Sequence, residues 1–299
     1  MLATSAPPAN ATPNADPLEK NFRTQLRDIG IPPRPTILEQ IDREMRKEEP
    51  DFRHLEQLIS ADVGLAAGLI KTANSPAFAF GRKVRSVHDA LLVLGLKAVV
   101  RTLAGLSLQN IFPNTPNLER FWDASATTAR ISAWLALQLR KRSQARPDDA
   151  YTFALFRDSG IPMLMIPFPE YLNILKAANS ERERSFTSVE DELLAINHAL
   201  VGAELAENWL LPEDIHAAIR HHHEAAVFSE DNPLALAEVS RDMISVTQLA
   251  EHLLQQISGL NQTCEWEKLG ESCCARLQLT ADEIDELATA CASMLREEA

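Results

Sequence analysis

Residues 198–223 decide how this chain folds, and they read HALVGAELAENWLLPEDIHAAIRHHH. Ala, Leu and Glu dominate the stretch, and these residue types favour helices. We therefore predict two helices, at about 198–209 and 213–223, on either side of Trp209-Leu-Leu-Pro212. The first helix opens with a histidine and the second closes with three. Since neutral imidazole is a good ligand for divalent metals, the same stretch is a candidate metal site.

The rest of the chain continues the helical pattern. Apolar residues recur at helical spacing, for example from Leu118 to about Arg142. Three capping boxes predict helix starts at Thr36-x-x-Glu39, Thr187-x-x-Glu190 and Thr280-x-x-Glu283. We find no credible strand and no internal repeat. The sequence therefore predicts an all-α fold, arranged as a two-lobed helical array.

Composition divides the chain into four stretches. Residues 1–17 are rich in Ala, Pro and Asn and are predicted to be a disordered tail. The Pro-containing break at 112–116 separates a predicted N-terminal helical lobe, 18–112, from a second lobe, 113–258. Residues 259–299 are predicted to form acidic C-terminal helices that could meet a basic partner.

Charge and cysteine usage narrow the function classes. The 299 residues carry a formal net charge of −13, and an acidic body repels phosphate backbones, so we do not expect nucleic-acid binding. The four cysteines form no C-x-x-C pair, which favours a reducing compartment. Neither a signal peptide nor an uninterrupted apolar run of about 20 residues is evident. We therefore predict a cytoplasmic protein without a membrane partner.

A metal site in this sequence needs ligands from several helices. Adjacent histidines on one helix point about 100° apart, so a single run rarely supplies a whole site. Asp158, His198 and Asp242 are expected on separate helices and are the further candidates. Ordinary roles stay open: His198 as the first residue of a helix, His222 and His223 as surface or core residues, and Asp242 as a polar helix residue.

Several segments together resemble the HDOD domain, a helical signalling module related to the HD phosphohydrolase superfamily. They are Asp62-Val-Gly-Leu65, Ala73-Asn-Ser75, Ser86-Val-His-Asp-Ala90, Phe121-Trp-Asp-Ala-Ser125, Phe156-Arg-Asp-Ser-Gly160, His198-Ala-Leu-Val-Gly-Ala203, Trp209-Leu-Leu-Pro212 and Ala218-Ile-Arg-His-His-His223. The resemblance covers about residues 20–250 and implies an HD-like helical core in the second lobe. It implies a vestigial HD-site cluster made of Arg157, Asp158, His198, His222, His223 and Asp242.

Two departures from that pattern concern the metal. In HD phosphohydrolases an adjacent His and Asp bind metal, helped by histidines from neighbouring helices and a later Asp. This chain has Arg157 where that His is expected, and Ala124 where many relatives have His in a Trp-x-His-Ser pattern. Arg stays protonated at ordinary pH, and a unit charge pair at about 4 Å is worth about 4 kcal/mol at an effective dielectric near 20. We therefore predict no bound metal and no other cofactor.

The role of Arg157 has two interpretations. In the first, it replaces the charge of the metal and bonds Asp158 or Asp242. In the second, it points to solvent and the pocket is simply lost.

The resemblance implies bacterial signal transduction. We predict a non-catalytic signalling or scaffold module, not an enzyme, that works through protein–protein interaction. The chain is too short for a fused receiver domain, so its signalling partners are expected in trans, and a homodimer is left open. Two alternatives remain: a metal-dependent phosphohydrolase acting on a nucleotide or cyclic dinucleotide, and a nucleotide sensor without hydrolysis.

Overall fold

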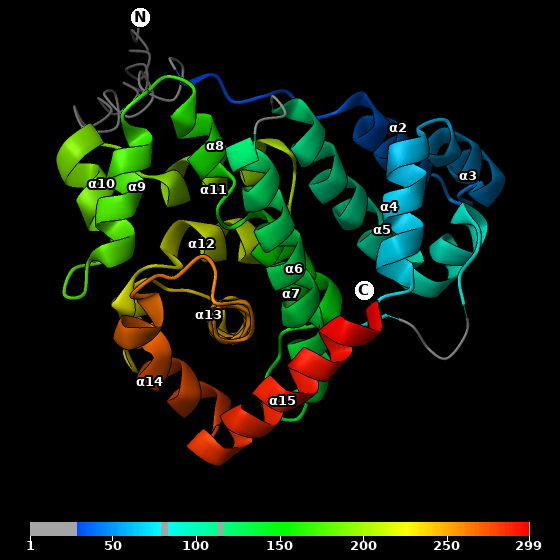
Figure 1. Cartoon of the computed structure of the whole chain (residues 1–299). Coiled ribbons are helices and arrows are strands. Elements are labelled where there is room, and N and C mark those ends of the chain that lie inside the picture. The colour runs from blue at the N-terminus through cyan, green and yellow to red at the C-terminus, as the bar shows by residue number, and fades with distance from the viewer. Residues whose placement is uncertain (1–28, 79–82, 113–115, 299) are drawn as a thin grey trace, which may run out of the picture.

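The computed structural model describes residues 29–78, 83–112 and 116–298, and every regular element in these ranges is a helix. The predicted all-α class is confirmed. The predicted disordered tail, residues 1–17, lies outside the described residues. Figure 1 shows the helices gathered into one body, with the C-terminal pair along its lower edge.

The first part of the chain forms helices α2 (Thr36–Met45), α3 (Phe52–Ser60), α4 (Val63–Ala73) and α5 (Val87–Ile111). Short polar side chains set where they begin. Asp51 accepts hydrogen bonds from the first backbone N–H groups of α3, and Asp62 and Ser86 do the same for α4 and α5. These caps satisfy donors that have no partner inside the helix.

Helix α5 is, within the described residues, the one that is long and apolar enough to cross a membrane. Length and composition alone also fit the core helix of a soluble protein, and half of the apolar window is buried. The helix is broken at Gly95, which adopts φ +75°, a conformation that glycine tolerates. It packs against α2, α3, α4 and α7, so α5 is placed as a core helix.

The second part of the chain holds the site. Its elements are α6 (Pro116–Gln138), α7 (Pro147–Phe156), α8 (Gly160–Met165), α9 (Tyr171–Ser180), α10 (Phe186–Leu194), α11 (His198–Asn208), α12 (Glu213–His221), the short 3₁₀ helix η1 (Ala225–Phe228) and α13 (Glu238–Ser258). Helix α13 packs on α6, α7 and α12. Buried apolar residues from both parts of the chain belong to one continuous cluster, so the two predicted lobes share a core.

Two further helices, α14 (Glu265–Leu277) and α15 (Ala281–Glu298), pack on α13. The Thr280 capping box at the start of α15 is confirmed: Glu283 N–H donates to Thr280 Oγ1, and Thr280 N–H donates to Glu283 Oε2. The other two predicted boxes are wrong. Helix α2 has no side-chain cap, and Ser185 caps α10 in place of Thr187.

Candidate functional site

Four side chains from three parts of the second half of the chain converge on one point. They are Asp158, His198, His222 and His223, and their potential metal-ligand atoms all lie within 4.8 Å of one another. Asp158 stands in the turn between α7 and α8, and His198 is the first residue of α11. All three histidines are buried.

Two adjacent histidines reach the same point because α12 ends before them. The helix ends at His221, so His222 and His223 lie in a turn. Their side chains are therefore not held about 100° apart, as successive side chains of a helix are. His221 instead contacts Glu224 through Nδ1 at 2.7 Å. The histidine run therefore contributes two members to the cluster.

Four of the six distances among these atoms are close to those around one tetrahedral ion. Asp158 Oδ1 lies 3.5 Å from His198 Nε2 and 3.3 Å from His222 Nε2. His198 Nε2 is 3.5 Å from the Nε2 of His222 and 3.2 Å from that of His223. A tetrahedral ion bonded at about 2.1 Å, the usual Zn–N length, separates its ligands by about 3.4 Å. The residues present therefore fit one divalent ion.

The opposite ring nitrogens orient the histidines for that role. Each Nδ1 faces an oxygen that can only accept a hydrogen bond, so each Nδ1 carries a proton and Nε2 is the nitrogen left to bind an ion. The contacts are His198 to Glu190 Oε2 at 2.7 Å, His222 to the Ile219 carbonyl at 2.7 Å, and His223 to Glu265 Oε2 at 2.6 Å.

Without an ion, the pKa values of these groups shift in different directions. Burial disfavours the charged form of His198, but the charge of Glu190 and the contact with Asp158 outweigh it and raise the pKa of His198 to about 10. Burial, together with the neighbouring His223, lowers the pKa of His222 to about 3. Burial also opposes ionisation of Asp158, yet the Arg157 guanidinium holds its pKa well below the ordinary value. One positive charge is therefore favoured at His198, whereas a second one at His222 is disfavoured.

Arg157 is buried and points into the site. Its Nε donates to Asp158 Oδ2 at 3.0 Å, and its Nη2 donates to Glu251 Oε1 at 2.9 Å. The alternative in which Arg157 faces solvent is therefore wrong. The expected bond to Asp158 is present, while the second partner is Glu251 of α13 and not Asp242.

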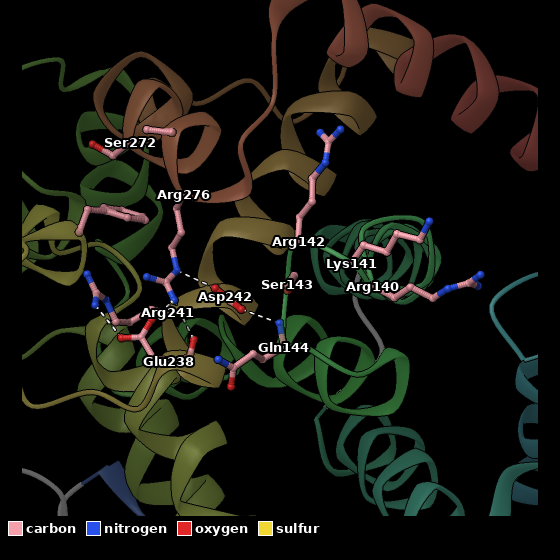
Figure 2. A pocket seen from close by; sticks show the side chains of 12 residues that line it. Arg140, Lys141, Arg142, Ser143, Gln144, Glu238, Arg241, Asp242, Ser272 and Arg276 are labelled. Atoms are coloured by element: carbon pink, nitrogen blue, oxygen red, sulfur yellow. Dashed lines mark hydrogen bonds and ion pairs between the residues drawn. The ribbon is translucent and has the colours of Figure 1, made fainter.

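Asp242 does not belong to the cluster, and its assignment there is wrong. Its Oδ1 accepts from Arg276 Nε at 2.7 Å and its Oδ2 from the backbone N–H of Gln144 at 2.6 Å. It lines a separate cleft, whose volume is about 640 Å³. Figure 2 shows Asp242 there, between Arg276 and Gln144. Asp242 precedes Glu251 by two and a half turns of α13, and this offset places the two acids on opposite faces of the helix.

A cavity of about 610 Å³ opens beside the cluster. Asp158, Arg157 and His223 line it, and so does Ala124, at the position where an imidazole was expected. The exposed cations Arg120 and Lys176 line it as well.

Sequence reasoning missed the three glutamates that support the site, Glu190, Glu251 and Glu265. Each lies on a helix, where acidic residues normally face solvent, and no local motif marks Glu251 or Glu265. Glu190 belongs to a predicted capping box, and this was the only sequence feature that gave Glu190 a structural role. Tyr171 also donates its hydroxyl to Glu190, which fixes this carboxylate behind His198.

The geometry of the cluster weakens the two reasons for which no bound metal was predicted. That prediction rested on missing imidazoles and on repulsion from Arg157. Four other ligand atoms nevertheless remain together. Arg157 faces the far oxygen of Asp158, and its charge is matched by Glu251.

Known proteins share both the sequence pattern and the fold. The sequence model of the HDOD domain matches residues 31–225. An uncharacterized protein of Treponema pallidum is 28% identical over 196 residues, which are 64% of this chain and only 37% of that relative.

Solved structures share the helical arrangement at low identity. A candidate phosphohydrolase of Shewanella amazonensis has a TM-score of 0.64 at 19% identity, covering 91% of this chain and 93% of its own. A candidate signal-transduction protein of Marinobacter aquaeolei has a TM-score of 0.61 at 20% identity, covering 94% and 65%. Since the family match extends over more than half of the sequence, the chain belongs to the HDOD domain family.

Proposed function

We propose that this chain is a non-catalytic signal-transduction module whose histidine cluster holds one divalent ion as a structural centre. The observation that carries the proposal is the burial of Arg157 between Asp158 and Glu251. A metal-dependent hydrolase needs an open coordination position, where an ion makes hydroxide from water near neutral pH. Here the four protein groups would fill a tetrahedral set around one ion, and Arg157 occupies the second carboxylate oxygen of Asp158.

Electrostatics support an ion in the cluster. Glu190 and Glu265 are almost fully buried behind His198 and His223, and hydrogen-bonded carboxylates in this position raise the basicity of ligating imidazoles. The ion would be held by Asp158 and the three Nε2 atoms. Its chemistry would be charge neutralisation and cross-linking of the turns after α7 and α12 to the start of α11.

The test combines metal analysis with an activity assay. We expect about one divalent ion per chain to survive dialysis, and both Asp158→Ala and His198→Ala to lose it. We also expect no hydrolysis of bis(p-nitrophenyl) phosphate or cyclic dinucleotides with Mn²⁺, Mg²⁺ or Zn²⁺. Turnover by the wild type that disappears in Asp158→Ala would overturn the non-catalytic assignment.

The cavity beside the cluster favours a second candidate function, the sensing of a nucleotide without hydrolysis. Its volume, about 610 Å³, suits a small molecule, and the exposed side chains of Arg120 and Lys176 offer positive charge. A thermal-shift screen with nucleotides tests this candidate. Stabilisation in the wild type that falls in Lys176→Glu supports sensing, and no shift with any nucleotide rejects it.

Signalling through protein partners in trans, in the cytoplasm, completes the proposal. The net charge of −13 favours protein partners over nucleic acid. Co-purification from the native cell is the direct measurement, with the wild type compared against Asp158→Ala. A partner retained by the wild type and lost by the variant supports this role.

A further inference from the structure

Helix α14 reaches into the site although it lies beyond the residues matched by the family. The match ends at residue 225, whereas α14 begins at Glu265. The side chain of Glu265 is only 3% exposed, and its Oε2 lies 2.6 Å from His223 Nδ1. A buried carboxylate at this distance from an imidazole makes a charge-assisted hydrogen bond, which is stronger than a neutral one. The C-terminal segment therefore supplies a partner to one of the four cluster residues.

The start of α14 is held over the cluster by a small set of contacts. Lys268 contacts Glu265 and also donates to the carbonyl of Arg184, in the loop between α9 and α10, at 3.0 Å. The backbone N–H of Cys264 donates to the Asn179 carbonyl at 3.0 Å. These bonds tie the first turn of α14 to the α9–α10 region, which also provides Glu190 to His198.

A ring contact adds to this attachment. Trp266 stacks on His252 of α13, with ring centroids 4.2 Å apart. Glu265 is thus presented to His223 only while α14 is docked on α13 and the α9–α10 loop. Figure 1 shows α14 beside α13, with α12 next to it.

We infer that Glu265 is a positioning residue for the ion, and that ion binding and docking of α14 are coupled through the Glu265–His223 contact. The inference rests on the proposed function, because it requires the cluster to bind an ion. Glu265 holds the Nδ1 proton, turns Nε2 toward the centre and makes the imidazole a better ligand. Loss of such a supporting partner typically costs about 10- to 100-fold in metal affinity.

Coupling of this kind is reciprocal. If docked α14 raises the affinity of the cluster for an ion by some factor, the ion shifts the docking equilibrium of α14 by the same factor. The C-terminal helices α14 and α15 are then presented differently in ion-loaded and ion-free protein. Ion binding at the cluster would therefore stabilise the docked position of α14 and α15, which follow the family-matched region.

The experiment compares Zn²⁺ affinity in the full chain and two kinds of variant. We expect Glu265→Ala to bind Zn²⁺ about 10- to 100-fold more weakly than the wild type. Glu265→Gln keeps a hydrogen-bond acceptor without the charge, so its loss should be smaller. The matched control is Glu267→Gln, because Glu267 is an exposed residue on the same helix that pairs with Arg182. This control should bind like the wild type.

A second measurement needs no variant. Amide hydrogen exchange of residues 265–277 in the wild type should slow when Zn²⁺ is added and quicken with a chelator. The coupling would be overturned if wild type and Glu265→Ala bound Zn²⁺ with equal affinity, or if Zn²⁺ did not change the amide exchange rate of α14. Either result would leave the ion site itself intact. Absence of Zn²⁺ binding by the wild type would instead overturn the proposed ion site, and the coupling with it.

Discussion

Arg157 and Asp158 are neighbours in sequence and form an ion pair inside the protein, with Nε 3.0 Å from Oδ2. His198 and His222 contact the other carboxylate oxygen, Oδ1. One carboxylate is therefore shared between a permanent cation and a cluster of metal-ligating nitrogens. This division of Asp158 separates the site from an open hydrolytic centre and leads to the first prediction.

Removing the guanidinium should strongly destabilise the fold. Arg157→Ala leaves the partly buried carboxylates of Asp158 and Glu251 without their partner, and breaking a buried pair in this way costs up to about 3–5 kcal/mol. Urea unfolding at neutral pH measures the loss. The double variant Arg157→Ala/Glu251→Gln should recover part of it, because one of the two stranded charges is gone. A single variant as stable as the wild type would contradict the buried pairing.

The metal-free protein should lose stability in alkali through His198. The pKa of His198 is raised to about 10 by Glu190 and Asp158 against the opposing effect of burial, compared with 6.5 for the free side chain. The folded state thus binds this proton more tightly, so its contribution is complete below about pH 6.5 and disappears as the pH rises through 10. Urea unfolding between pH 6 and 10, in the presence of a chelator, tests this.

His198→Asn is the control for that experiment, because it removes the titrating group. The decline between pH 6.5 and 10 should shrink in this variant. It should also shrink in wild type loaded with an ion, where Nε2 is occupied. Identical pH profiles for wild type and His198→Asn would count against the raised pKa.

Gly160 should tolerate no side chain. A Cβ at this position would stand 2.0 Å from the backbone carbonyl oxygen of His198, so α8 and α11 could not keep their separation. We expect Gly160→Ala to destabilise the protein by at least the usual 1–3 kcal/mol of overpacking and to lower ion retention by shifting His198. Thermal unfolding and metal analysis give the two readouts.

Gly64→Ala serves as the comparison for Gly160→Ala. Its added Cβ would meet only a side-chain oxygen of Asp62, at 3.3 Å, and alanine suits a helix better than glycine. This variant should unfold close to the wild-type temperature. Equal tolerance at both glycines would contradict the close approach of α8 to α11.

Asp242 should matter for stability but not for the ion. Asp242→Ala removes the acceptor of Arg276 and of the Gln144 backbone N–H, and stranded donors of this kind cost about 1–3 kcal/mol. Metal content should stay at the wild-type level, whereas Asp158→Ala should lose the ion. Loss of the ion in Asp242→Ala would contradict this prediction, because it would show that Asp242 affects ion binding at the histidine cluster.

Local sequence patterns could predict much of the fold. Helical spacing and Asp caps act within a few residues, so the helices and the caps at Asp51 and Asp62 follow from the sequence. The HDOD resemblance brought Asp158, His198, His222 and His223 together correctly. A position on a long helix is harder, because Asp242 and Glu251 are equally acceptable until the packing of α13 decides which face meets the site.

The supporting carboxylates could not be predicted for a related reason. Glu190, Glu251 and Glu265 come from three different helices, and Glu251 and Glu265 meet their partners Arg157 and His223 only across long stretches of chain. Arg157 posed the same difficulty. Its sequence neighbours allowed both an inward and an outward side chain, and Glu251, 94 residues later, supplies the partner that holds it inward.

The Glu265–His223 contact also bears on how this family is divided into modules. The region that the family model matches, residues 31–225, contains all four converging side chains but neither Glu251 nor Glu265. Natural or engineered recombination at residue 225 would therefore transplant the histidines without two of the acids that orient and balance them. A segment exchanged between relatives has to extend at least through the first turn of α14 to keep the whole site. The end of the family match therefore differs from the end of the segment that supplies the site.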